Sequence, residues 1–135
     1  MKPVVWVAAT ALAVACAREA TYPEPSEGRA IFRDNCVQCH GATGRGDGPW
    51  AAFYDPPPAD LTQLSENGRF PQARILNVID GYDRSGLPGK EMPEFGLPLE
   101  GETVPVDAGD GVFTPTPRPL AALLVYLESI QRSDG

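Results

Sequence analysis

Apolar side chains recur at helical spacing most clearly near the end of the chain, after Pro117 and Pro119. One apolar face is formed there by residues three and four positions apart, namely Leu120, Leu123, Leu124, Leu127 and Ile130. This spacing predicts a helix that packs one side against a core. From Gln131 to Gly135 the sequence is polar, and we expect this end to fray.

A second helix is predicted to begin at Pro71, because proline suits the first turn of a helix. Ile75, Leu76 and Ile79 follow at helical spacing. Gly81 lies where a C-terminal cap is expected, so the helix should end just before it.

A third helix is predicted from Glu27 to about Asn35, with Ser26 as its N-cap. Glu27 places a negative charge in the first turn, where it interacts favourably with the helix dipole. This helix leads directly into Cys36.

Turn-forming residues dominate the stretches between these helices. Residues 41–58, GATGRGDGPWAAFYDPPP, predict a long loop. Residues 82–116 are also predicted to be loop, in which 102–114 is compatible with a short hairpin around Asp110-Gly111. The chain has 135 residues with 15 prolines and 14 glycines, which favours one domain with few long elements. The predicted fold class is all-α, with three or more helices and long Pro/Gly-rich loops.

The leading segment has the pattern of an export signal. Met1-Lys2 is followed by an apolar run over residues 3–15, which is shorter than the roughly 20 residues that a membrane-spanning helix needs. We assign 1–15 to a lipoprotein-type signal peptide, 16–25 to a flexible tether, 26–131 to the folded domain and 132–135 to a frayed C-terminus.

Cys16 closes the string Leu12-Ala13-Val14-Ala15-Cys16, which resembles a bacterial lipobox. In such a motif the cysteine becomes the lipidated first residue, although leucine is expected where Ala13 stands. Cleavage after Ala17 is the alternative and would discard Cys16. Lipidation at Cys16 is the favoured interpretation. Both alternatives predict an exported protein, on the periplasmic side, and the favoured one anchors it to a bacterial membrane through lipid.

Cys36-Val37-Gln38-Cys39-His40 is a C-x-x-C-H string, the pattern of covalent haem attachment. One helical turn presents both sulfurs to one porphyrin edge, and His40 then projects under the ring centre to bind iron. A zinc site needs four ligands, and a thioredoxin-like redox pair needs a βαβ pattern. The sequence has one histidine and no second C-x-x-C, so it favours haem over both alternatives.

Because His40 is the sole histidine, the sixth iron ligand must be another residue type. Met92, in the string KEMPEF, is the only methionine besides Met1. A thioether favours ferrous iron, and a His/Met pair raises the reduction potential. The alternatives are that Met92 fills a gap in the core, that Lys90 is the ligand, or that the position is open.

Taken together, these features resemble class I cytochrome c, and in particular the small bacterial domains of cbb3-type oxidase subunits. The resemblance includes C-x-x-C-H-G, a glycine-rich loop ending in Gly48-Pro49, a middle helix, Met92-Pro93 and a final helix. It covers about Glu27 to Ile130. It implies a small cytochrome c fold wrapped around one covalent haem c, with His40 and Met92 as iron ligands.

The resemblance also implies roles for other residues. Pro49 is expected to offer its carbonyl to the free ring nitrogen of His40. Leu61, in Asp60-Leu61-Thr62, resembles a haem-packing position, and an ordinary core leucine is the alternative.

Gly28 and Phe32 resemble the family's helix contact, where the last helix crosses closely near Tyr126. The stretch between Phe95 and Pro119 is longer than a minimal domain of this kind requires. Its length suggests a surface specific to one partner.

Charge limits the possible partners. The formal net charge is -7 and the sequence pI is about 4.6, which argues against nucleic acid or an anionic membrane surface. Redox partner proteins with basic docking surfaces are favoured. The predicted function is a single-electron carrier rather than an enzyme. The alternatives are a fixed haem subunit of a larger oxidoreductase, or a haem enzyme or gas sensor with an open iron position.

Overall fold

The computed structural model describes residues 22–85, 92–109 and 111–132. Several sequence predictions concern residues outside these ranges, namely the signal peptide over 1–15, lipidation of Cys16, the start of the tether, Lys90, Asp110 and residues 133–135.

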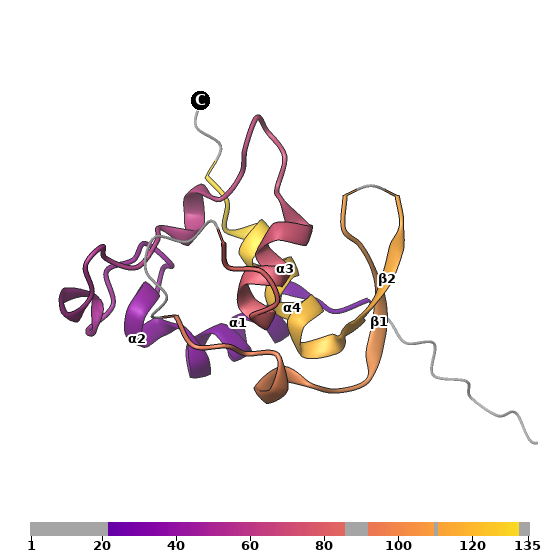
Figure 1. Ribbon diagram of the computed structural model, residues 1–135, viewed down its shortest axis with the longest axis horizontal. Helices are drawn as coiled ribbons and strands as arrows, with labels where there is room; N and C mark the ends of the chain where they lie inside the picture. The colour runs from indigo at the N-terminus through magenta and orange to yellow at the C-terminus, as the bar shows by residue number, and fades with distance from the viewer. Residues whose placement is uncertain (1–21, 86–91, 110, 133–135) are drawn as a thin grey trace, which may run out of the picture.

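The described residues form helices α1 (Pro25–Asn35), α2 (Val37–His40) and α3 (Gln72–Asp80), strands β1 (Thr103–Asp107) and β2 (Phe113–Pro117), and helix α4 (Arg118–Ser129). Short 3₁₀ turns lie at Ala51–Phe53, Leu61–Gln63 and Leu97–Leu99. Figure 1 shows α1, α3 and α4 gathered in the centre, with α2 and its following loop at one end and the hairpin at the other. Within the described residues, no helix combines the length and the apolar character needed to cross a membrane.

Helix α1 begins earlier than predicted, and Ser26 is not its N-cap. Pro25 occupies the first turn, where its missing N–H costs nothing, so the cap falls on Glu24. The Glu27 carboxylate accepts a hydrogen bond from the Glu24 N–H at 3.2 Å. It also accepts two from the Arg118 guanidinium, at 2.8 and 3.1 Å, and these lower the pKa of Glu27. One carboxylate therefore joins the starts of α1 and α4.

The prediction for α3 is confirmed. The helix follows Pro71 and ends at Gly81, which adopts a left-handed φ of 96°. Ile75 and Ile79 are buried and Leu76 is half-buried, as their spacing predicts.

Helix α4 is also confirmed, and it supplies most of the core. It starts at Arg118, with Pro119 in its first turn. The buried hydrophobic cluster contains residues from α1, α3, β1, α4 and the 3₁₀ turn at Leu97–Leu99: Phe32, Ile75, Ile79, Leu99, Val104, Val106, Leu120, Ala121, Leu123, Leu124, Tyr126 and Leu127.

The crossing of α1 and α4 depends on Gly28. A Cβ atom at this position would lie 1.9 Å from the Ala122 carbonyl oxygen and 2.6 Å from the Tyr126 Cβ. Only a glycine permits so close an approach of two helix backbones. The rings of Phe32 and Tyr126 then pack with centroids 5.3 Å apart. The predicted contact of the first and last helices is confirmed.

The all-α prediction is right for the helices but omits a sheet. Strands β1 and β2 pair antiparallel, with Thr103 opposite Pro117 and Asp107 opposite Phe113. The hairpin considered for 102–114 is therefore present, with its second strand extending further. Val104 and Val106 are 1% and 0% exposed, because alternate residues of β1 face α4 and the rest of the core. The hairpin is part of the core.

The chain does not fray at Gln131. Its amide oxygen accepts from the N–H groups of Leu64 and Ser65 at 2.8 and 3.0 Å, and its NH₂ group donates to the carbonyls of Leu61 and Leu127. The Arg132 N–H also donates to the Thr62 carbonyl at 2.9 Å. These bonds tie the end of α4 to the loop after residue 60, so Gln131 and Arg132 are held in the fold.

Candidate functional site

Cys36, Cys39 and His40 lie on one helical turn. The Cys36 N–H donates to the Phe32 carbonyl at 2.8 Å and so ends α1. The Cys36 carbonyl in turn accepts from the N–H groups of Cys39 and His40, at 3.3 and 2.9 Å, which starts α2. Both cysteines are free thiols of intermediate exposure. The turn therefore presents two thiols and an imidazole from one short, well-bonded element.

The chemistry of these cysteines differs from that of a redox pair. Burial, reinforced by the neighbouring Cys39, raises the pKa of Cys36 to about 12. A dithiol exchange site needs a lowered thiol pKa, because the thiolate is the nucleophile. In the ranges that the structure covers, no three His, Cys, Asp or Glu side chains gather as a metal site. Neither a thioredoxin-like site nor a zinc site fits the described residues.

His40 is held by Ala59, and the predicted bond to Pro49 is wrong. The His40 Nδ1 lies 3.0 Å from the Ala59 carbonyl oxygen, which can only accept, so Nδ1 carries the proton. Burial lowers the pKa of His40, and the bond to Ala59 opposes this only in part. A neutral imidazole with its proton on Nδ1 leaves the lone pair on Nε2, as a metal ligand requires.

The path of the loop after α2 explains why Pro49 does not reach His40. The Trp50 N–H donates to the Gln38 carbonyl at 2.8 Å, so the chain around the exposed Pro49 runs alongside the middle of α2. The Pro56–Pro58 run then returns along Gly46, where a Cβ would lie only 2.2 Å from the Pro58 carbonyl oxygen. Because of this close approach, the carbonyl of the next residue, Ala59, lies beside the His40 imidazole.

Leu61 belongs to the same returning segment. Its N–H donates to the Gly44 carbonyl at 2.6 Å, and its half-buried side chain packs against the core. Asp60 fixes the segment through hydrogen bonds from the Thr62 N–H and hydroxyl, and these lower the pKa of Asp60. A contact between Leu61 and a cofactor remains a prediction.

Met92 is half-buried and also packs against the core. Its carbonyl accepts a hydrogen bond from Arg84, and the carbonyl of Pro93 accepts a second from the same guanidinium at 2.6 Å. Sequence reasoning missed Arg84. Its role lies in side-chain bonds to main-chain atoms, which no motif encodes. Ligation by Met92 stays a prediction, and the competing Lys90 lies outside the described residues.

The residues present fit a covalently attached haem. The turn offers two free thiols and an imidazole, and the core is bordered by apolar side chains that are only partly covered. These are Ile31, Cys36, Val37, Leu61, Leu64, Phe70, Leu76, Met92, Phe95 and Ile130. Partly covered apolar residues beside such a turn are what a large apolar group would cover on binding.

Comparison with known proteins gives a family match and a likeness among solved structures. A family model described as Cytochrome c matches residues 25–101. No curated protein sequence matches this chain.

The structural likeness is to a chain of the Kuenenia stuttgartiensis reducing HAO-like protein complex Kustc0457/Kustc0458, with a TM-score of 0.51 and 21% identity. The match covers 78% of this chain and 41% of that one, so this chain spans about two fifths of its length. At this identity the likeness shows a shared fold alone.

Proposed function

The chain belongs to the cytochrome c family, and from this premise we propose that it is a single-electron carrier with one covalently attached haem, whose iron is ligated by His40 and Met92. Members of this family bind haem c covalently and serve haem electron transfer. The observation that carries the proposal is the turn on which Cys36 and Cys39 accompany an imidazole whose Nδ1 is held by the Ala59 carbonyl.

Each residue of the turn has a separate task in this proposal. Cys36 and Cys39 hold the haem through thioether bonds, and His40 binds the iron through Nε2. The haem supplies a one-electron ferric/ferrous couple when bound. Ala59 keeps the His40 ring in one tautomer and one orientation, which raises the basicity of the ligand.

Met92 would supply a soft sulfur donor to the iron. A neutral thioether stabilises ferrous iron relative to ferric iron, so a His/Met pair has a higher reduction potential than a pair of nitrogen donors. A filled sixth position also keeps small molecules from the iron, which favours electron transfer over catalysis.

Covalent attachment is tested by acidified acetone extraction of the purified holoprotein. We expect the haem to stay with the protein, and one haem per chain by pyridine haemochrome assay. The double variant Cys36→Ala, Cys39→Ala is expected to release any haem that it binds. Haem extracted from the unaltered protein would contradict the proposal.

Ligation by Met92 is tested in the oxidised protein through the weak far-red absorption band of a sulfur–iron bond. Met92→Leu nearly conserves side-chain volume, so it removes the sulfur with little loss of packing. We expect this variant and Met92→Ala to lose the band and to lower the reduction potential. Leu64→Met, at another half-buried position, is the matched control. An unchanged band and potential in both Met92 variants would refute this ligation.

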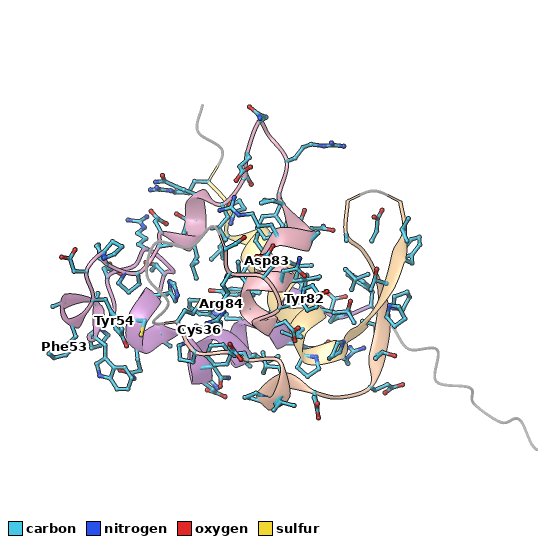
Figure 2. All side chains as sticks on the ribbon, viewed as in Figure 1. Cys36, Phe53, Tyr54, Tyr82, Asp83 and Arg84 are labelled. Atoms are coloured by element: carbon cyan, nitrogen blue, oxygen red, sulfur yellow. The ribbon has the colours of Figure 1, made fainter. Side chains whose placement is uncertain are left out.

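A second candidate function is a fixed haem subunit of a larger oxidoreductase. Several large apolar side chains are more than half exposed: Trp50, Phe53, Tyr82, Leu97, Val112 and Phe113. Figure 2 shows Phe53 and Tyr54 at the outer edge of the loop beside α2, away from the core. Exposed apolar side chains that lie together are typical of surfaces that contact a partner, and Trp50 and Phe53 lie at the two ends of one 3₁₀ turn in this loop. Stable co-purification with one partner after mild detergent extraction would favour this function.

A haem enzyme or gas sensor with an open iron position is the further alternative. It differs in one measurable property, because an open ferrous iron binds carbon monoxide readily whereas a Met92-ligated iron does not. Rapid, complete carbon monoxide binding by the reduced protein at neutral pH would favour this alternative over a carrier.

We also propose that the protein is exported and anchored by lipid at Cys16. The apolar run that ends at Cys16 and the polar 16–25 segment support this proposal. An acidic domain is repelled by anionic lipid, so acyl chains must supply the attachment, at about 0.8 kcal/mol for each buried methylene. A diacylglyceryl-modified Cys16 in the membrane fraction is expected. A soluble form that begins at Arg18 would refute the anchor.

The acidity of the chain supports redox partners with basic docking surfaces. At a net charge of -7, association with a basic partner is accelerated by electrostatic attraction, which salt screens. The electron-transfer rate with a basic partner is expected to fall as ionic strength rises.

A further inference from the structure

Arg84 joins two separate segments of the chain through main-chain atoms. Its Nε donates to the carbonyl of Val78 at 3.2 Å, in the last turn of α3. Its two terminal nitrogens donate to the carbonyls of Met92 and Pro93. All three nitrogens of one guanidinium are therefore used, each on a different carbonyl.

The turn after α3 explains how Arg84 reaches these atoms. Gly81 ends the helix in a left-handed conformation, and the Asp83 carboxylate accepts a hydrogen bond from the Ser85 N–H at 2.9 Å. The chain bends at this point, and the Arg84 side chain lies over the end of the helix it has just left (Figure 2). A cation is favoured there because the last carbonyls of a helix carry partial negative charge.

Other contacts of the described residues hold the part of this segment that follows Met92. The Phe95 N–H donates to the Ile79 carbonyl at 2.9 Å, so the chain is bound to α3 three residues after Met92. The Arg84 side chain bonds the Met92 main chain itself. A group that holds the Met92 carbonyl restricts where its thioether can lie.

We propose that Arg84 is the positioning residue for the Met92 ligand. By holding the carbonyls of Met92 and Pro93 against the end of α3, it limits the freedom of the thioether and so opposes its displacement from the iron. The inference rests on the proposed ligation by Met92. The planar guanidinium is essential to it, because a lysine ammonium is a compact point charge that does not span three carbonyls in this way.

The test measures how readily imidazole replaces Met92 in the oxidised holoprotein, followed by loss of the far-red sulfur–iron band. Arg84→Lys keeps the charge and loses the planar fork, and Arg84→Gln loses both. Arg74, on the exposed side of α3 in an ion pair with Glu66, provides matched controls in Arg74→Lys and Arg74→Gln.

We expect the imidazole affinity to rise at least tenfold in both Arg84 variants, because even one lost hydrogen bond from a charged donor corresponds to about that factor. The Arg74 variants should stay within twofold of the unaltered protein. Urea unfolding of each variant separates displacement of the ligand from a general loss of stability.

The possible outcomes distinguish ligation by Met92 from the role of Arg84. An unaltered protein that lacks the far-red band refutes ligation by Met92, and the role of Arg84 falls with it. If the band is present but the Arg84 variants bind imidazole as the Arg74 variants do, the inference about Arg84 alone is wrong. The same holds if Arg84→Lys is less stable to urea yet binds imidazole with unchanged affinity, because Arg84 then has only a structural role.

Discussion

Replacing Gly28 with alanine should force apart the two helices that organise this core. The added Cβ would lie 1.9 Å from the Ala122 carbonyl oxygen, whereas close carbon–oxygen contacts between helices are about 3.3 Å or longer. The backbones must therefore separate by roughly 1.4 Å. The obstructing atom belongs to the main chain, so no change of rotamer relieves the overlap.

The net effect is the difference between two opposing terms. Alanine is favoured over glycine inside a helix by about 1 kcal/mol. Overpacking a core costs about 1–3 kcal/mol, and the upper end applies here because the shift also disturbs the contact of Phe32 with Tyr126. We expect Gly28→Ala to lower the free energy of unfolding by about 2 kcal/mol, and the melting temperature by roughly 8 °C.

Urea unfolding of the holoprotein, followed by far-ultraviolet circular dichroism, measures this difference. Ala30→Gly is the matched control. Ala30 is exposed on the same helix, so this variant measures only the difference in helix propensity between alanine and glycine. Ala30→Gly should lower the free energy of unfolding by about 1 kcal/mol. If Gly28→Ala is as stable as the unaltered protein, or more stable, the close crossing does not require glycine and the reasoning fails.

Other contacts predict substitutions that lower the stability of the protein. Gln131→Ala should lower the free energy of unfolding by about 2–3 kcal/mol in urea titrations, because it leaves partly buried main-chain groups unpaired; an effect under 0.5 kcal/mol would contradict this. Val106→Ala should lower the free energy of unfolding by about 2 kcal/mol, and Val112→Ala, at an exposed position, by less than about 0.5 kcal/mol. Equal melting temperatures in the two variants would exclude a core role for the hairpin. The lowered pKa of Glu27 means that its pairing with Arg118 stabilises the protein at neutral pH and ceases to do so as acid protonates the carboxylate. Glu27→Gln should therefore be less stable than the unaltered protein at neutral pH, with a difference that shrinks towards pH 3, and a constant difference would refute this.

The elements that sequence predicted well are those set by local rules. Helix α3 follows from Pro71, the spacing of Ile75 and Ile79, and the cap at Gly81, all within one short stretch. The turn that carries Cys36 and His40 is equally local, because its geometry is that of a single helical turn. The hairpin was foreseen from its turn residues.

The contacts that the sequence did not predict are hydrogen bonds to main-chain atoms, and some of them join residues far apart in the sequence. Ala59 holds the imidazole through a carbonyl that every residue possesses, and the run of three prolines before it was the available signal. Arg84 and Gln131 are polar residues of ordinary surface type, yet Arg84 binds a carbonyl nine residues on and Gln131 binds one 70 residues away. Glu24 became the cap because Pro25 occupies the first turn, a preference that outweighed the usual choice of serine.

The crossing of α1 and α4 also affects the order in which the protein can be built. A chain made from its N-terminus exposes Cys36 and Cys39 well before Ala122 exists, and an isolated helix as short as α1 is marginal in water. Until α4 arrives, Phe32 lacks the ring on which it packs. The thiols therefore emerge on a nascent polypeptide in which the crossing of the first and last helices has not yet formed.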